Sequence, residues 1–420
     1  MRFCSALTGL VIVSVAYCQN ASKPAPEAEP KSVTVPITLD HNRVVIDVYL
    51  PLPDGSTKRV RGWVDNGNPD LEMSRRAATV MGLNVTCGEK SCSAPPPREV
   101  TVGGMKISLT SVNEAKIPLK PLTAASVMAP GMSAEINLPS TVLHNYDVLV
   151  SFPDREFSIG QRGTIHFRGM SGKILVNAAN GLVQMPSKIE GKNYNLGLDV
   201  GSSFSFLSNE VFDKVASAHP DCPHMTGAVG NANMWGRDDE PKWKVLRVDR
   251  VQYGPVFLTG VAAASLPAGS ALFENRVGTA TAGLLGSNAL LNYRVGIDYA
   301  HSMAYFEVGT TFKAPDFDVI GLTLRPEDDG RFTVLGVADF EGKPSVPEVQ
   351  LGDHLVAVDG IPVPDSTMGQ VWSMLEGQPS QERKLLIERG GKQLTVVAKV
   401  QHFLGEQPEK DEIKHKRSYP

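Results

Sequence analysis

Short runs in which apolar and polar residues alternate make up most of this chain. Residues 33–50 alternate around an Asp40-His41-Asn42 turn, and residues 58–64 form a further run that ends at Asp65. A period of two is typical of half-buried β-strands. Helical spacing is confined to short stretches such as residues 73–82 and 210–218. The pattern therefore predicts a mainly β fold with a few short helices.

The order of these runs repeats within the chain. Residues 138–146 match residues 285–293, and each segment leads into a pair of strands. The two aspartates that end matching strands, Asp65 and Asp199, are 134 residues apart, whereas the matching Asn-Tyr pairs are 147 residues apart. About thirteen extra residues in the second copy fit a surface-loop insertion. The repeat predicts two β-rich lobes, over residues 32–163 and 164–312.

A third region follows a proline-containing linker near residue 315. Residues 332–337, 351–361 and 385–400 have strand character, and residues 367–375 form a short helix. The apolar residues at helical spacing on it are Met368, Val371, Trp372 and Leu375. They fit core packing, and a helix beside a strand also forms a groove that an extended peptide can enter as an added strand. An α+β domain is predicted over residues 318–402, with a disordered tail over 403–420.

The N-terminus indicates export. Arg2 precedes an apolar run over residues 6–16, and a polar Pro/Ala/Glu-rich segment follows. This is the anatomy of a secretory signal peptide, predicted over residues 1–18, with a disordered linker over 19–31. Cys18 allows a lipid anchor as the alternative, although Tyr17 is larger than the residue that such processing prefers. We expect a periplasmic or extracellular protein that contacts a membrane only if Cys18 is lipidated.

Charge and cysteine content exclude several classes of function. The formal net charge is −4, and no Lys/Arg-rich tract occurs, so nucleic acid is not an expected partner. Cys87 and Cys92 flank a polar Gly-Glu-Lys-Ser loop and are candidates for a small disulfide. His219 and His224 bracket Cys222, but no second cysteine stands at zinc-site spacing. The sequence therefore predicts no metal and no cofactor.

Residues 196–203 contain the most distinctive candidate site. Apolar residues lead to Asp199, and Gly201 then allows a sharp turn. Residues 62–68 are a degraded copy with Asp65 and Gly67. An aspartate on a turn can simply cap the backbone. Two such carboxylates at contact distance can instead share a proton and activate a water molecule for amide hydrolysis. No serine-hydrolase elbow, zinc-protease motif or phosphate-binding loop competes with this interpretation.

The second copy resembles a lobe of the bacterial retropepsin-like aspartyl proteases. The resemblance is carried by Asp199-Val200-Gly201-Ser202-Ser203, by residues 283–287 and by residues 293–299. It implies a bilobal, pepsin-like pair of β-barrels with Asp199 and Asp65 as catalytic residues. The residues that it implies as supports of the two turns are Gly201, Ser202, Ser203, Gly67, Leu285 and Gly286, with the Ser202 hydroxyl bonded to the catalytic carboxylate.

The C-terminal region is similar to a circularly permuted bacterial PDZ domain. Residues 321–324 and 351–360, with their Gly-Asp-His-Leu and Val-Asp-Gly pieces, carry this similarity. It implies a groove that binds extended peptides or C-termini. The groove residues that it implies are Gly321, Leu322, Leu324 and Met368.

Both turns depart from the family pattern. Asn66 and Val200 follow the aspartates, where the family usually has Thr or Ser, and Val200 cannot supply the hydroxyl that helps to hold the lobes together. Asn68-Pro69 stands in place of the two serines of the second copy, and Pro139 stands where Gly286 does. Because proline lacks an N–H and fixes φ, we expect a different or strained backbone path at Pro139.

Two functions follow from these observations. The first is an exported aspartic endopeptidase that acts on peptide or protein substrates, with a PDZ domain that binds peptides. The second is an inactive pseudoprotease that serves as a peptide-binding sensor or scaffold. The endopeptidase requires the carboxylates of Asp65 and Asp199 to face each other. An Asn68-Pro69 turn that directs Asp65 away would favour the scaffold.

Overall fold

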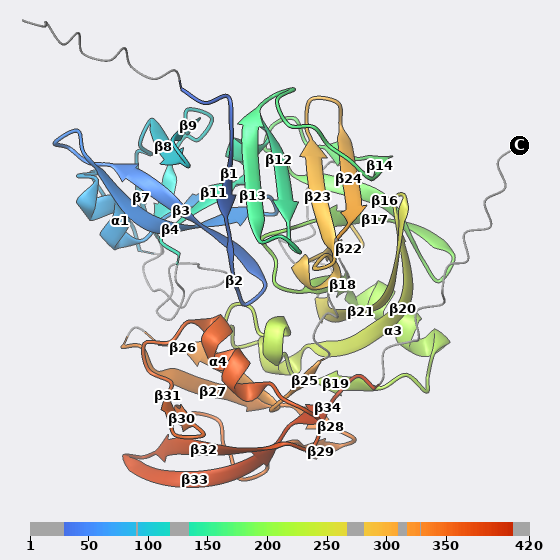
Figure 1. Ribbon diagram of the computed structural model, residues 1–420. Coiled ribbons are helices and arrows are strands. Elements are labelled where there is room, and N and C mark those ends of the chain that lie inside the picture. Colours follow the sequence, from blue (N-terminus) through green and yellow to red (C-terminus); the bar gives the residue numbers. More distant parts are fainter. Residues whose placement is uncertain are drawn as a thin grey trace, which may run out of the picture.

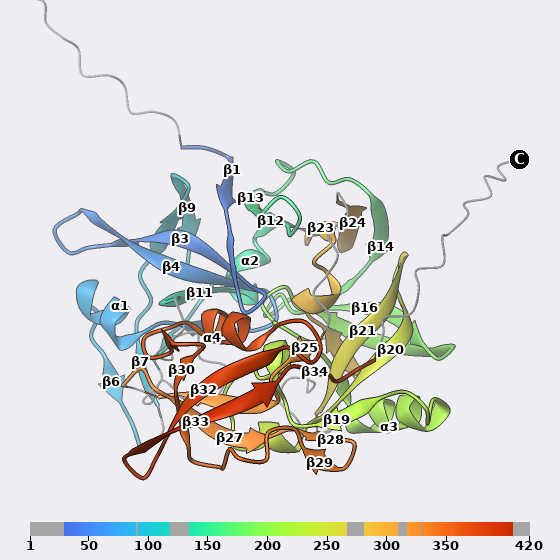
Figure 2. The same ribbon diagram turned by 60° about the horizontal axis from the view of Figure 1, so that its bottom comes forward.

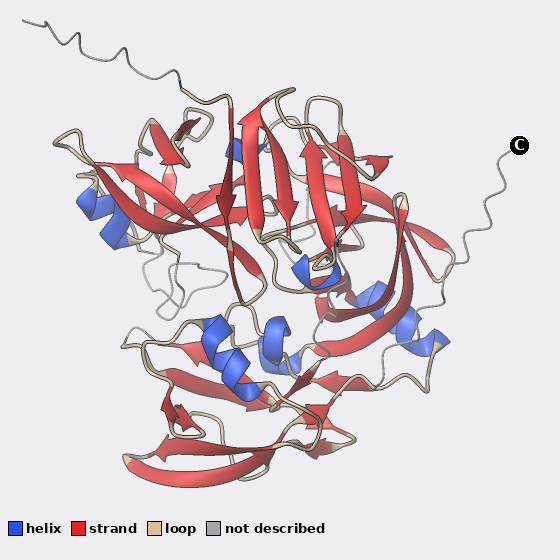
Figure 3. Ribbon diagram, in the orientation of Figure 1, coloured by secondary structure: helices blue, strands red, loops and turns tan. Residues whose placement is uncertain are grey.

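The computed structural model describes residues 29–89, 91–117, 134–266, 281–309, 317–327 and 329–405. Strands predominate in these ranges, and the helices are few and short (Figure 3), so the fold is mainly β as predicted. The signal-peptide segment with Cys18, most of the linker over residues 19–31 and the tail from residue 406 lie outside the described residues. None of the helices in the described ranges is long and apolar enough to cross a membrane.

The first lobe contains two sheets (Figure 1). The larger sheet has the order β11 (Ile136–Pro139), β4 (Thr57–Asp65), β3 (Arg43–Pro51), β8 (Glu99–Val102) and β9 (Met105–Ser108), with β2 (Thr38–Asp40) paired to β3. The smaller sheet has the order β5 (Leu71–Glu72), β10 (Ala115–Ile117), β7 (Cys92–Ala94) and β6 (Thr86–Cys87).

The second lobe is built on one long sheet. Its order is β15 (Leu175–Val176), β16 (Val183–Ile189), β17 (Lys192–Leu198), β22 (Gly283–Leu285), β18 (Ser205–Ser208), β21 (Val256–Leu266), β20 (Lys244–Tyr253), β19 (His224–Thr226), β28 (Asp339–Phe340) and β29 (Lys343–Pro344). The last two strands come from the C-terminal region, where Thr226 pairs with Asp339. The second lobe and the C-terminal region therefore share a continuous sheet.

A six-stranded sheet joins the two lobes. Its order is β1 (Ser32–Pro36), β13 (Glu156–Gln161), β12 (Tyr146–Ser151), β23 (Tyr293–Asp298), β24 (Met303–Val308) and β14 (Met170–Lys173). The lobes meet where β12 pairs antiparallel with β23, so that Val148 lies opposite Ile297. The paired strands that close each copy of the repeat are thus neighbours at the centre of one sheet.

The C-terminal region forms a module of its own at the bottom of the molecule in Figure 1. Its main sheet has the order β26 (Leu322–Pro326), β27 (Phe332–Val337), β30 (His354–Val358), β32 (Glu382–Arg389) and β33 (Lys392–Lys399), with β31 (Ile361–Pro362) on β30. A separate pair consists of β25 (Asp318–Val319) and β34 (Gln401–His402). Figure 2 brings this module forward, with α4 (Met368–Leu375) at its side toward the lobes.

Serine and threonine caps determine where the main helices begin. The Ser74 side chain accepts a bond from the backbone of α1 (Arg75–Val80), and Ser208 does the same for α3 (Asn209–Ala218). Thr367 and Gln370 form a capping box at the start of α4. The remaining helical turns are α2 (Ser140–Leu143) and the 3₁₀ turns η1 (Gly230–Ala232), η2 (Glu240–Lys242) and η3 (Ser287–Ala289).

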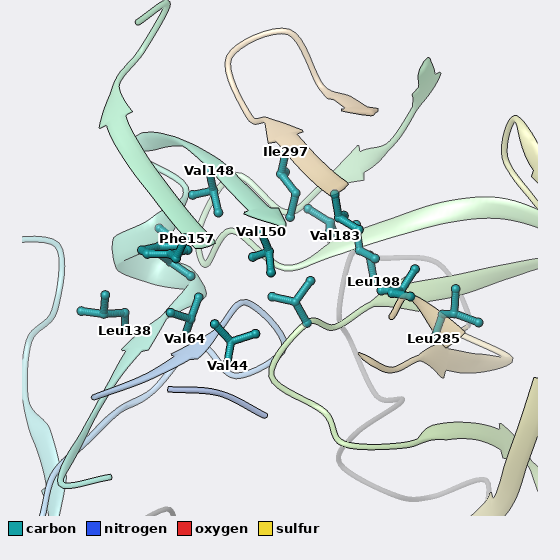
Figure 4. Packing of buried hydrophobic residues seen from close by; sticks show 14 of the residues in the cluster. Val44, Val64, Leu138, Val148, Val150, Phe157, Val183, Leu198, Leu285 and Ile297 are labelled. Atoms are coloured by element: carbon teal, nitrogen blue, oxygen red, sulfur yellow. The ribbon is translucent and has the colours of Figure 1, made fainter. Parts of the chain in front are cut away.

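One apolar core runs through both lobes (Figure 4). Val64 and Leu138 come from the first lobe and Leu198 and Leu285 from the second, and all four side chains are buried. A second core is shared between the second lobe and the C-terminal module, and it includes Phe206 of β18 and Leu324 of β26. The three parts of the chain are therefore held together by apolar packing as well as by shared sheets.

Candidate active site

Asp65 and Asp199 occupy equivalent positions in the two lobes. Each lies at the end of a strand, Asp65 as the last residue of β4 and Asp199 directly after β17. A parallel strand crosses beside each one, with Leu138 opposite Val64 in the first lobe and Leu285 opposite Leu198 in the second. The backbone N–H of Asp199 donates to the Leu285 carbonyl at 3.0 Å. Leu285 thus supports the second turn directly.

The two aspartate turns face each other. A Cβ atom at Gly67 would overlap the Asp199 carboxylate, and a Cβ atom at Gly201 would lie 2.6 Å from Oδ1 of Asp65. Only glycine allows so close an approach from both sides. Both aspartates are almost fully buried, with 3% of Asp65 and 5% of Asp199 exposed. Each turn therefore lies against the aspartate of the other lobe, and the Asn68-Pro69 turn does not take Asp65 out of this contact.

Backbone amides hold each carboxylate in place. Gly67 N–H donates to Oδ1 of Asp65 at 3.1 Å, and Gly201 N–H donates to Oδ1 of Asp199 at 3.0 Å. Ser202 N–H adds a second bond to Oδ1 of Asp199 at 2.9 Å. Charge-assisted bonds of this kind fix the orientation of a buried carboxylate.

Asn66 connects the two turns. Its side-chain amide donates to the Leu198 carbonyl at 2.8 Å, and its oxygen accepts from the Val200 N–H at 2.8 Å. The Val200 side chain is buried and apolar, but its carbonyl accepts a bond from the Ser287 hydroxyl at 2.8 Å. One asparagine thus makes two bonds across the lobes, so the turns are connected although neither aspartate is followed by a hydroxyl residue.

The supporting serines contribute differently from the expectation. The Ser202 hydroxyl donates to the Phe204 carbonyl at 2.6 Å, so it is the backbone N–H, not the hydroxyl, that contacts Asp199. The Ser203 hydroxyl donates to the Asn231 carbonyl at 2.8 Å. The hydroxyls of both serines therefore hold the turn and the neighbouring loop, and the hydrogen bonds to the Asp199 carboxylate come from backbone N–H groups.

Pro139 does not distort the first lobe, contrary to expectation. Its φ and ψ of −77° and 168° are close to those of Gly286, −95° and 178°. The N–H of Gly286 donates to the Ser205 hydroxyl at 3.0 Å. The first lobe has Leu71 at the position that corresponds to Ser205, so no acceptor is left unsatisfied there. Proline is tolerated because extended backbone with φ near −65° suits its ring.

A buried arginine, which the sequence pattern did not identify as a site residue, lies beside the aspartates. Arg43 is 2% exposed, and its guanidinium carbon lies 5.2 Å from the centre of the Trp63 ring. The Trp63 indole N–H donates to the Gly201 carbonyl at 3.1 Å, which connects this pair to the second turn. Burial lowers the pKa of Arg43 to about 10, and the negative charges that oppose this shift include both Asp65 and Asp199.

The loop over residues 228–240 joins the aspartate site to the C-terminal module. Arg43 donates to its Met234 carbonyl at 2.5 Å. On the opposite side, Asn233 Oδ1 accepts from the Leu324 N–H of β26 at 2.9 Å, and the Thr323 hydroxyl donates to the Ala228 carbonyl at 2.7 Å. The loop therefore occupies the edge of β26 that does not pair with β27.

The groove residues implied by the PDZ resemblance are buried in this contact. Leu322, Leu324 and Met368 are each at most 1% exposed and belong to the core that the module shares with the loop. A Cβ atom at Gly321 would collide with the Ser345 side chain. A free peptide could reach these side chains only by displacing the chain's own loop.

The turn between β2 and β3 closes the other side of the module. Asp40 accepts bonds from the Thr367 hydroxyl and the Gly369 N–H, both at 2.9 Å, at the start of α4. His41 Nε2 lies 3.1 Å from the Gly230 carbonyl. Burial, followed by the charge of Arg43, lowers the pKa of His41 to about 3, so the ring is neutral. With Nε2 protonated it donates to that carbonyl.

Glu240 anchors the loop from inside. It is fully buried, accepts from the Trp235 N–H at 2.9 Å and bonds the Asn233 side chain. Burial raises the pKa of Glu240 to about 7. No sequence pattern predicted this residue, because a single glutamate in a proline-containing polar segment has the composition of a surface loop.

The remaining candidates make local contacts of their own. Cys87 and Cys92, the candidate pair from the sequence, form a disulfide between β6 and β7. Cys222 is a free, half-buried thiol in the loop after α3. Asp298, which ends β23, accepts the His301 N–H at 3.0 Å and holds the following turn.

Comparison with solved structures gives distant likenesses, one of them to an aspartic proteinase. The structure is similar to a crystal structure of an aspartic proteinase from Irpex lacteus, with a TM-score of 0.40 and 11% sequence identity, over 66% of this chain and 98% of that chain. A likeness this distant does not establish the chemistry. No family model and no curated protein matches the sequence.

Proposed function

We propose that this chain is an aspartic-type endopeptidase in which Asp65 and Asp199 form the catalytic pair. The observation that carries the proposal is the reciprocal contact of the turns, in which each glycine faces the aspartate of the other lobe. Two buried carboxylates in contact do not ionise independently, so one proton is shared between them. This is the protonation state that hydrolysis without a metal or a covalent intermediate requires.

The proposed reaction cleaves a peptide bond by direct attack of water. The ionised carboxylate removes a proton from a water molecule as its oxygen attacks the scissile carbonyl, and the protonated carboxyl donates its proton to the carbonyl oxygen. Collapse of the tetrahedral intermediate then transfers a proton to the leaving amine and restores the pair. The substrates are extended peptide segments of proteins.

In this proposal the C-terminal module binds peptides as a PDZ domain does. It can do so only after the loop over residues 228–240 has left the edge of β26. With the loop in place, the module supports the Met234 carbonyl that Arg43 contacts. Peptide capture by Leu322, Leu324 and Met368 stays a prediction, and so does export of the protein.

One observation favours the second candidate function, a pseudoprotease scaffold. The buried Arg43 interacts electrostatically with both Asp65 and Asp199. A nearby cation favours the ionised form of a carboxylate, and two ionised carboxylates hold no shared proton. In this second function the chain binds a peptide but does not hydrolyse it.

The test incubates purified protein, without the predicted signal peptide, with a denatured protein substrate from acidic to neutral pH. Asp199→Asn removes the proposed catalytic carboxylate, and Asp213→Asn on the exposed face of α3 is the matched control. Cleavage by wild type and by Asp213→Asn, but not by Asp199→Asn, supports the endopeptidase. Equal cleavage by all three proteins, or by none at any pH, rejects it.

A further inference from the structure

Three residues with metal-ligating side chains come together at the outer edge of the second lobe. His219 directly follows α3 as its C-cap residue, Cys222 lies in the loop after it, and Asp249 belongs to β20. Their ligand atoms, a ring nitrogen, a thiol sulfur and a carboxylate oxygen, all lie within 4.8 Å of one another. Helix α3 and strand β20 lie near each other in the second lobe (Figure 1). We propose that His219, Cys222 and Asp249 bind a zinc ion.

The set of donor atoms suits zinc. Imidazole nitrogen, thiolate sulfur and carboxylate oxygen are the three donors that Zn²⁺ takes in proteins, whereas Ca²⁺ and Mg²⁺ prefer oxygen alone. One thiolate and one carboxylate supply two negative charges, which balance the charge of the ion. A fourth position remains for water. Binding replaces the thiol proton, which passes to the solvent as the sulfur–zinc bond forms.

The backbone brings His219 and Cys222 to one side of the site. Cys222 N–H donates to the His219 carbonyl at 3.0 Å, so the two residues occupy a single tight turn. The spacing of two intervening residues is common among zinc ligand pairs. Sequence alone could not complete the site, because Asp249 is 27 residues beyond Cys222 and arrives through the pairing of β19 with β20.

A carboxylate next to the cluster can orient the histidine. Oε2 of Glu190, in the turn between β16 and β17, lies 3.0 Å from Nε2 of His219. Histidines that bind metals commonly pair their second ring nitrogen with such a carboxylate, which fixes the ring. Glu190 is therefore a positioning residue in this proposal.

The surroundings are negatively charged. Asp249, Asp221 and Glu190 all act electrostatically on the Cys222 thiol. Within the described residues, no lysine or arginine forms an ion pair with Asp249. A bound divalent cation would neutralise this local excess of carboxylates.

The geometry requires only a small adjustment. With zinc–ligand bonds of about 2.0–2.3 Å in a tetrahedron, ligand atoms lie roughly 3.3–3.7 Å apart. Ligand atoms that lie up to 4.8 Å apart must therefore approach one another by at most about 1.5 Å. Because the Asp249 side chain is exposed and the other two are half-buried, rotation of side chains can supply this movement.

The experiment measures zinc binding directly. Protein without the predicted signal peptide, with the Cys222 thiol reduced and the Cys87–Cys92 disulfide intact, is stripped with a chelator and titrated with Zn²⁺, with Ca²⁺ as the comparison ion. We expect one zinc per chain, and at least about tenfold weaker binding in Cys222→Ser and His219→Gln. Replacement of zinc by Co²⁺ should give a thiolate absorption band that Cys222→Ser lacks. Thermal unfolding confirms that each variant is folded.

Two matched controls separate coordination from general attraction. Asp221→Asn removes a carboxylate that acts on the thiol but does not belong to the cluster, and His224→Gln removes a nearby histidine. Both should bind zinc within about twofold of wild type, whereas Asp249→Asn should bind about tenfold or more weakly. The proposal is overturned by no binding at micromolar zinc, by equal loss in Asp221→Asn and Asp249→Asn, or by calcium binding as tight as zinc binding.

Discussion

Asn66 accepts a hydrogen bond from the backbone N–H of Val200 across the boundary between the lobes. These residues occupy equivalent positions in the two turns, yet only Asn66 reaches the opposite turn with its side chain. Its second bond, to the Leu198 carbonyl, means that one carboxamide satisfies a buried donor and a buried acceptor. The connection is therefore asymmetric although the two turns are related by the internal repeat.

Replacement of Asn66 by alanine should destabilise the protein strongly. It leaves the Val200 N–H and the Leu198 carbonyl without partners in a buried site, which costs about 2–4 kcal/mol of unfolding free energy. Chemical denaturation measures the change. Asn145→Ala is the matched control, because Asn145 also bonds backbone carbonyls but lies at the surface, where a loss of about 0.5 kcal/mol is expected. A similar loss in both variants would show that the connection between the turns contributes little.

Gly67→Ala tests the close approach of the turns. The new methyl group would overlap the Asp199 carboxylate, so the turns must separate. We expect a stability loss of about 1–3 kcal/mol from overpacking. Any peptidase activity should fall at least about a hundredfold, because separation of the turns moves the carboxylates of Asp65 and Asp199 out of their relative positions.

The control for this substitution is Gly88→Ala. A Cβ atom there would meet its nearest neighbour, the Ser91 carbonyl, at an ordinary 3.7 Å, so stability and activity should not change. If Gly67→Ala retained wild-type activity, the turns would not need contact for function, and the proposed catalytic pair would be wrong.

His41 should make the protein sensitive to acid. Its pKa falls from about 6.5 in the unfolded chain to about 3 in the folded protein, mainly through burial. The folded state therefore resists protonation, so stability is complete above pH 6.5 and is lost as the pH falls toward 3, by an amount on the order of 4 kcal/mol. His41→Gln retains a donor for the Gly230 carbonyl and should flatten this loss.

Urea unfolding at a series of pH values measures the effect, with the exposed His166→Gln as control. The contribution of Glu240 to the pH dependence of stability has the opposite sign. Its pKa is raised to about 7, so the folded state loses stability as the pH rises from about 4.5 to 7. The Glu240 contribution is the same in wild type and in both variants, so it cancels when the unfolding free energies of variant and wild type are subtracted at each pH. Equal acid slopes for wild type and His41→Gln would contradict the assignment to His41.

The sequence predicted the repeat, most strands and both aspartate turns, because these depend on local periodicity and on short motifs. It placed Asp65 and Asp199 in equivalent turns, and the structure brings those turns together. The sequence pattern did not predict contacts between distant segments. Arg43 begins an ordinary apolar strand, and nothing in that pattern indicates that its charge is buried beside two aspartates. The expectation of strain at Pro139 failed because the fold requires a φ there that proline adopts, and the sequence does not show which φ a position requires.

The sequence pattern led us to expect a peptide groove on the C-terminal module, but it did not indicate that the chain's own loop packs against the residues named for it. The loop over residues 228–240 contains two glycines and ends in four charged residues, a composition that suggests a free surface segment. Its position follows from tertiary contacts that include the bond between Asn233 and the Leu324 N–H. Whether that bond holds the loop on the module can be measured.

Asn233→Ala should release the loop from the edge of β26. The substitution removes the acceptor of the Leu324 N–H and the side-chain partner of the buried Glu240. Hydrogen exchange in residues 228–240 and 322–326 should therefore be at least about tenfold faster, since a loss of about 1.4 kcal/mol in local stability corresponds to that factor. The exposed Asn193→Ala is the control and should exchange like wild type. Because Arg43 bonds the same loop at Met234, a released loop should also change any peptidase activity, whereas unchanged exchange at β26 would show that apolar packing alone holds the module in place.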